Sequence, residues 1–230
     1  QTGGILNIQN LGTTVGNPGP RIDGSALTIS NVVGVDGTAA LEGRVDLTNG
    51  TILVETADNN GNARIAVGRD GTGTFNATNS SVTIQAGDDT ALLFLGGTGT
   101  SGSLVNSQGT ATFDNSTVVI NSDSTGAGSA VLNVGRNGNG GTSTLNVNNG
   151  STITLTNNAA STGSESLTVG RNNTIGFMNV DASTVTSGDF VSVGRDGGTG
   201  TLSITNGGSV DNDNLTGLAR IGRSGGTGTL

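Results

Sequence analysis

Arginine is the residue type whose spacing most clearly suggests a binding site. The 230 residues include nine basic residues, all arginine, and 17 acidic residues, for a net charge of −8. Four of the arginines follow successive glycines that each end a short apolar segment: Arg136, Arg171, Arg195 and Arg223. If those segments stack on one another, the guanidinium groups form a ladder, and neighbouring like charges repel unless they are neutralised.

Such an arginine ladder has two interpretations. In the first, which the sequence favours, each arginine is structural and bonds to backbone carbonyls, to Asp196 or to nearby asparagines. In the second, the ladder lines a groove for an anionic polymer such as an acidic surface polysaccharide.

Acidic residues form two clusters that offer the oxygen ligands that calcium prefers. The clusters are Asp211-Asn212-Asp213-Asn214 and Asp88-Asp89. Neither has EF-hand spacing, and the chain has no Gly-Gly-x-Gly-x-Asp series. We therefore expect solvated loop carboxylates. A structural calcium is left without support, and the sequence predicts no metal site and no cofactor.

Composition removes most catalytic chemistry. The chain has no His, Cys, Trp or Tyr, so it offers no imidazole base, thiol nucleophile or ordinary zinc site. Paired carboxylates remain. Asp70 and Asp196 share a position in the repeat described below, but Asn137 and Asn172 occupy it in other copies, which indicates a turn preference. We predict no catalytic residues and no enzymatic activity.

Threonine pairs separated by one residue are similar to the flat threonine arrays of ice-binding solenoids. Most of the pairs lie across the glycine-rich link between the first and second strands that we expect in each repeat, described below. A flat array is not expected there, so we expect ordinary outward-facing threonines. The pairs are Thr72/Thr74, Thr98/Thr100, Thr142/Thr144, Thr199/Thr201 and Thr227/Thr229.

An internal repeat determines where all these side chains lie. A short apolar segment ending in glycine recurs at intervals of 24 to 39 residues, a period typical of solenoids. We call these glycines the anchors: Gly34, Gly68, Gly96, Gly135, Gly170, Gly194 and Gly222. Each coil corner needs a residue that tolerates positive φ or a close neighbouring backbone, and glycine accepts both.

Each repeat supplies three short segments in which apolar residues alternate with Thr, Asn or Ser. Examples are 132–134, 144–147 and 151–155. This alternation is typical of half-buried strands. Short strands of this kind bury their apolar face only by stacking on like strands. The sequence thus predicts one domain over 1–230: an all-β parallel β-solenoid with three strands per coil, roughly seven coils and little or no helix.

The repeats resemble those of large exported bacterial proteins. The pattern Val-Gly-Arg-Asp/Asn-Gly-x-Gly-Thr-Leu is similar to autotransporter passenger domains and to the repeats associated with PEP-CTERM surface proteins. The resemblance covers roughly residues 30–230 and is strongest at 131–156 and 190–205, whereas the copies at Gly34 and Gly96 depart from it. It implies an extracellular β-solenoid at the bacterial cell surface that acts as an adhesin, surface layer or biofilm-matrix component.

The expected partners follow from the charge and from the two ends of the sequence. An acidic chain disfavours nucleic acid and anionic membranes, and no apolar run could span a bilayer. Both ends fall inside a coil, so we expect either a piece of a longer surface protein or head-to-tail self-association into filaments. A glycan- or ice-binding module on the same scaffold is the alternative function.

Overall fold

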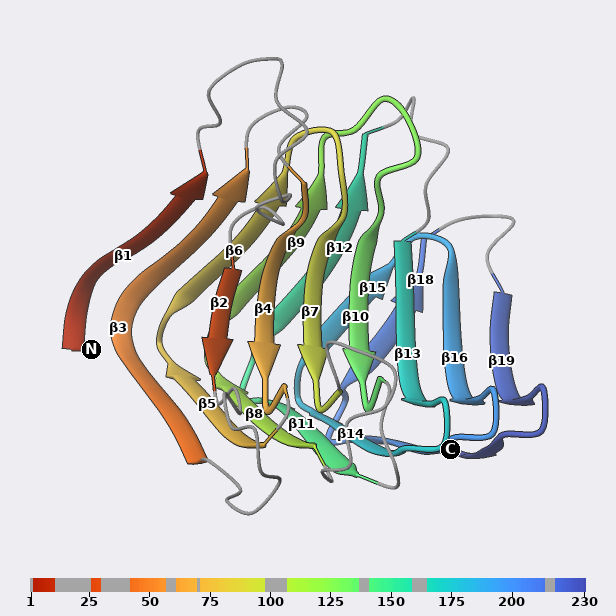
Figure 1. The fold of residues 1–230 in the computed structure, drawn as a ribbon. Helices are drawn as coiled ribbons and strands as arrows, with labels where there is room; N and C mark the ends of the chain where they lie inside the picture. The colour runs from red at the N-terminus through yellow and green to blue at the C-terminus, as the bar shows by residue number, and fades with distance from the viewer. Residues whose placement is uncertain are drawn as a thin grey trace, which may run out of the picture.

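The computed structural model describes residues 2–10, 26–29, 42–56, 61–69, 71–97, 107–136, 141–158, 165–213 and 218–230. Within these ranges the chain forms 20 strands and no helix. All of the strand pairs are parallel, and strands that are neighbours in a sheet come from successive repeats. The predicted parallel β-solenoid is therefore confirmed (Figure 1).

The first face of the solenoid is a seven-stranded sheet whose strands lie side by side in Figure 1. Its strands are β2 (Ala26–Ile29), β4 (Ala63–Val67), β7 (Ala91–Leu95), β10 (Ala130–Val134), β13 (Glu165–Arg171), β16 (Phe190–Arg195) and β19 (Leu218–Arg223). In this sheet Leu132 pairs with Leu93 on one side and with Leu167 on the other. Apolar residues of successive repeats thus form inward-facing columns.

The second and third faces belong to one 13-stranded sheet that bends around a corner. The second face contains the first half of β3 (Glu42–Thr56), then β5 (Thr72–Thr78), β8 (Gln108–Asp114), β11 (Thr142–Asn148), β14 (Ile175–Asp181), β17 (Thr199–Thr205) and β20 (Thr227–Thr229). The third face contains β1 (Thr2–Asn10), the second half of β3, β6 (Ser81–Ala86), β9 (Thr117–Ser122), β12 (Thr152–Asn157), β15 (Thr184–Ser187) and β18 (Ser209–Asn212).

Five complete coils of three strands follow one another, from β4–β6 to β16–β18. The strands β1 to β3 precede them and β19 and β20 follow. Our prediction of roughly seven coils counted one coil for each anchor glycine. The first anchor, Gly34, lies outside the described residues, and the last, Gly222, is followed by a single further strand.

The core is a narrow column of alternating side chains between the three faces. In β5 every second residue is buried, and Phe75 and Ala77 point inward. In the neighbouring β8 the order is reversed, so that Phe75 pairs with Ala111 and Ala77 pairs with Phe113. The two phenylalanine rings meet edge to face, with centroids 5.6 Å apart. Burying side chains of this size contributes roughly 1.5–3 kcal/mol each.

The corner between the first and second faces is built on the anchor glycines. Gly170 has a φ of 72°, and a Cβ atom added there would lie 2.0 Å from the carbonyl oxygen of Thr199 in the next coil. Positive φ and close backbone approach thus occur together at this position: the first favours glycine, and the second leaves no room for a side chain. The anchor therefore lets the chain turn while successive coils stay in contact.

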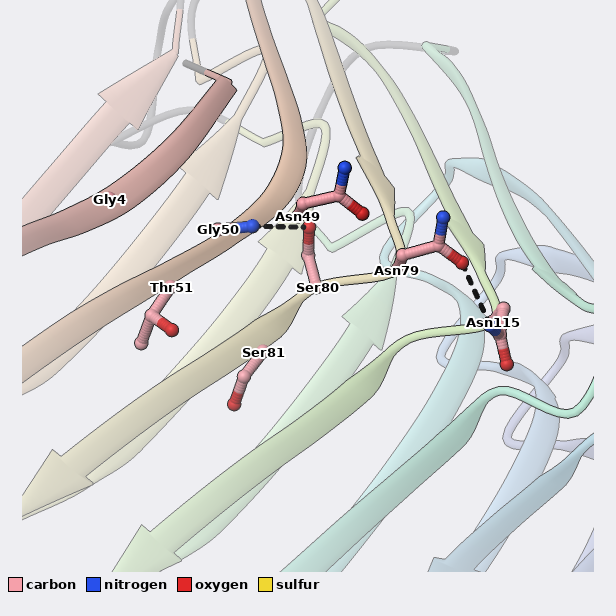
Figure 2. A pocket seen from close by; sticks show the side chains of 8 residues that line it. All are labelled: Gly4, Asn49, Gly50, Thr51, Asn79, Ser80, Ser81 and Asn115. Atoms are coloured by element: carbon pink, nitrogen blue, oxygen red, sulfur yellow. Dashed lines mark hydrogen bonds between the residues drawn. The ribbon is translucent and has the colours of Figure 1, made fainter.

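The corner between the second and third faces is built on asparagine and serine. Asn79 and Asn115 both have positive φ, and the Asn115 amide donates a hydrogen bond of 2.8 Å to Asn79 Oδ1 (Figure 2). In four successive coils this corner has a buried serine whose hydroxyl accepts a hydrogen bond from a backbone amide of the preceding coil; it directly follows an asparagine in the first two of these coils. These serines, which we call the serine column, are Ser80, Ser116, Ser151 and Ser183.

No helix in the described residues is long and apolar enough to cross a membrane.

Candidate functional site

The arginine ladder lies where the strands of the first face end. Arg171 closes β13, Arg195 closes β16 and Arg223 closes β19, and the strand register pairs Arg171 with Arg195 and Arg195 with Arg223. Arg136 occupies the same position one coil earlier. Val134 pairs with Val169, and the Arg171 amide donates a hydrogen bond of 3.0 Å to the Gly135 carbonyl, so Arg136 lies beside Arg171 in the ladder. The four predicted arginines therefore stack in the expected order.

Asp196 is the carboxylate at the centre of this ladder. Its Oδ2 atom lies 2.9 Å from Arg195 Nε and 3.4 Å from Arg171 Nε. Neither Nε makes a hydrogen bond of ordinary geometry, so these contacts are ion pairs by distance alone. Asp196 directly follows Arg195 and has a φ of 51°. Its carboxylate lies close enough to contact both Arg195 and Arg171 of the preceding coil. The structural interpretation thus applies to two arginines, which share one carboxylate.

Arg136 has a different environment. Its guanidinium carbon lies 5.1 Å from the centre of the Phe94 ring, on the outer surface of the first face. Burial lowers the pKa of Arg136, and the positive charges of Arg171, Arg64 and Arg69 lower it further. Among the described residues no carboxylate lies within ion-pair distance of it. Neighbouring guanidinium charges in the ladder repel one another.

A groove of about 450 Å³, which we call the arginine groove, runs beside these side chains on the outer surface of the first face. Arg136, Arg171 and Arg195 contribute to its wall, and Asn133, Ser166 and Thr168 contribute further polar groups. The remaining lining residues are Asn62, Thr90, Leu92, Val131 and Phe190. Arg223, the fourth member of the ladder, does not line it.

Two polar residues of the groove are almost fully buried. Asn133 is 3% exposed and Thr168 is 1% exposed, and they are paired neighbours in β10 and β13. Both residues line the groove. Their side chains therefore bring an amide and a hydroxyl to the base of the groove.

Phe190 and Arg195 show how the groove wall is held. Phe190 begins β16 and Arg195 ends it, yet the Arg195 guanidinium carbon lies 5.6 Å from the centre of the Phe190 ring. The arginine side chain must therefore fold back along the outer surface of its own strand. A cation over an aromatic face is attracted to it by roughly 0.5–2 kcal/mol, which helps to fix the guanidinium in the groove.

The residues weighed as calcium ligands lie elsewhere. Asp88 and Asp89 are exposed, and Asp89 Oδ1 accepts a hydrogen bond of 2.9 Å from the Thr90 amide. Asp211 accepts a hydrogen bond of 3.1 Å from the Ser209 hydroxyl. The described residues contain no group of three or more acidic side chains that could hold a metal ion. Asn214 lies outside the described residues.

The paired-carboxylate and threonine arrangements can be placed only in part. Asp70 and Asn137 lie outside the described residues, while Asn172 and Asp196 both occupy turns with positive φ. The pair Thr98/Thr100 also lies outside them.

The expectation that most threonine pairs straddle a link is wrong for the pairs that are described. Thr72 and Thr74, for example, both lie within β5, because that strand begins earlier than its apolar residues indicate. The second face carries such pairs on β5, β11, β17 and β20. In β14, Ile175 and Phe177 stand at the two positions where the neighbouring strands carry threonines. Phe177 is 38% exposed, so the row of threonines is interrupted in this strand.

Sequence reasoning missed the polar base of the arginine groove. Asn133 lies between Leu132 and Val134, so alternation alone places it on the outer surface, and Thr168 has the same relation to its neighbours. Alternation together with the arginine column is therefore the sequence signal that places these two residues beside the arginines. The fold-back of arginine over Phe94 and Phe190 had no sequence signal, since it depends on side-chain rotamers.

Searches of protein-family models, of curated proteins and of solved structures return no match to this chain.

Proposed function

We propose that this chain is an extracellular structural and adhesive protein, a β-solenoid stalk or fibre component of a bacterial surface or biofilm matrix. The observation that carries the proposal is the serine column, which links each coil to the next through buried hydrogen bonds. Such links resist separation of the coils, which suits a rod that holds other groups away from a surface. The resemblance of the repeats to those of exported surface proteins supports the same role.

The proposal is tested on intact cells of the source organism. An antibody against the folded chain is expected to label unpermeabilised cells or their surrounding matrix in immunogold electron microscopy, and protease treatment of intact cells is expected to remove the label. Beads coated with the folded chain are expected to adhere to the same cells more than beads coated with the heat-unfolded chain. Labelling that appears only after permeabilisation would contradict an extracellular role, and equal adhesion of both bead types would contradict an adhesive one.

The absence of enzymatic activity and the self-association of the chain both stay predictions. Sedimentation velocity over a range of concentrations tests the second: a sedimentation coefficient that rises with concentration is expected.

A further inference from the structure

We propose that the arginine groove binds a carboxylated polysaccharide whose chain lies across the strands of the first face, along the solenoid axis. The proposal stands on the geometry of the groove and holds whether or not the chain is an adhesin. It gives the first face a ligand, which a purely structural rod would not need.

The charge of the groove carries the first step. Three guanidinium groups, from Arg136, Arg171 and Arg195, line it, and Asp196 is the carboxylate that two of them share. The groove is therefore positively charged in a protein whose net charge is −8. An anion placed beside Arg136 would relieve the mutual repulsion of the arginines and supply the counter-charge that this residue lacks among the described residues.

The polar base of the groove carries the second step. A simple anion site needs only positive charge, whereas Asn133 and Thr168 add a nearly buried amide and a nearly buried hydroxyl to the lining of the groove. An amide donates and accepts at once, which matches the hydroxyl groups of a sugar ring. Leu92 and Val131 provide an apolar surface beside them, on which the C–H side of a sugar ring can pack.

The spacing of the arginines carries the third step. Arg136, Arg171 and Arg195 come from three successive coils, so their backbones are about 4.8 Å apart along the axis. This repeat is comparable to the length of one sugar unit in an extended polysaccharide. A chain of acidic sugars can therefore present a carboxylate to more than one coil, and contacts on one chain reinforce each other.

The same residues disfavour a single-stranded nucleic acid. Sequence-tolerant binding of bases uses exposed aromatic faces for stacking. Here the faces of Phe94 and Phe190 are covered by the guanidinium groups of Arg136 and Arg195. The groove thus offers cations and hydrogen-bonding groups but no open stacking surface in the described part of the chain.

The test measures binding of polygalacturonate to the purified chain by isothermal titration calorimetry. Arg136→Gln is expected to weaken binding about tenfold, since it removes one charge-assisted contact. Arg44→Gln is the matched control, because Arg44 is exposed on the second face and paired with Asp46. It makes the same change of charge and is expected to alter the affinity less than twofold. Asn133→Ala is expected to weaken binding without any change of charge. Circular dichroism checks that each variant is folded.

Three further probes separate the alternatives. Neutral dextran is expected not to bind, and dextran sulfate and single-stranded DNA are expected to bind more weakly than polygalacturonate. The proposal is overturned if polygalacturonate does not bind, or if Arg136→Gln and Arg44→Gln weaken binding equally, since that result means a non-specific charge effect. Tighter binding of DNA or dextran sulfate overturns the assignment to a carboxylated sugar chain. If Arg136→Gln does not fold, Asn133→Ala alone decides between site-specific and diffuse binding.

Discussion

Gly170 shows at the scale of one residue why the turn from the first face to the second requires glycine. We predict that Gly170→Ala destabilises the protein by about 3 kcal/mol or more, because the new methyl group meets the Thr199 carbonyl and the φ of 72° is strained. Gly150→Ala is the control: its φ is 80°, but nothing lies within 4 Å of the added Cβ. It is expected to cost roughly 1 kcal/mol, the strain alone.

Urea denaturation followed by circular dichroism measures both free energies of unfolding. Equal losses for Gly170→Ala and Gly150→Ala would show that backbone strain, and not contact with the next coil, sets the requirement for glycine.

At the same scale, the sequence predicted the arginine column and named Asp196 as a partner, but it did not predict how the four arginines differ in their surroundings. The column follows from the repeat, since each arginine comes directly after an anchor glycine. Two facts depend on side-chain directions that no repeat encodes. Asp196 serves both Arg171 and Arg195, and Arg136 lies over Phe94 instead of beside a carboxylate. The groove could therefore be suggested from the sequence, but its charge balance could not.

Ser151 shows at the scale of the strands how one element is fixed to the next. Its hydroxyl accepts a hydrogen bond of 3.0 Å from the Ser116 amide and donates one of 2.7 Å to the Asn148 carbonyl. We predict that Ser151→Ala costs about 1–3 kcal/mol, because it leaves the buried Ser116 amide without its hydrogen-bond acceptor. Thr152→Ala, at an exposed position in the same coil, is expected to change stability by less than about 0.5 kcal/mol.

Thermal unfolding of the two variants provides the comparison. A Tm of Ser151→Ala as high as that of Thr152→Ala would mean that water replaces the serine hydroxyl, and that the serine column does not hold the coils together.

Strands could be predicted from the sequence where alternation was regular, as in β11 and β12, whereas the long strand β3 was not among the predicted segments. In later coils, two separate strands meet at the asparagine and serine corner. In β3 the strand continues through that corner, from Glu42 to Thr56, and Gly50 stands where later coils have serine. The inward-facing positions change from odd to even numbers across this corner in β3, and they do the same between β5 and β6, so alternation cannot show whether the backbone pairing is interrupted.

The described strands form a linear array in which the strands of each coil pair with those of the neighbouring coils. We predict that Leu145→Ala, which removes a fully buried side chain from β11, costs about 2–5 kcal/mol. Its effect is expected to fall with distance along the axis, because coupling between coils passes through nearest neighbours. Amide hydrogen exchange should accelerate most in β8, β11 and β14 and less in β5 and β17.

Hydrogen exchange with mass spectrometry measures this gradient. Uniform acceleration from β5 to β17 would indicate that the described coils unfold as one cooperative unit and would contradict nearest-neighbour coupling. Thr144→Ala, which changes an outward-facing residue next to Leu145, is the control and is expected to leave the pattern unchanged.

The reversed order of Phe and Ala in β5 and β8 has a consequence for how the array can change. The backbone of every complete coil has the same three-strand plan, so duplicating one coil leaves the strand pairing intact. A second copy of the coil β7–β9 would set Phe113 against another Phe113 and Ala111 against another Ala111. One column would then be overfilled and the next would hold a void, and both defects destabilise a core. Side-chain volume thus disfavours duplication of either coil at this point of the array, although the backbone pairing alone would accept it.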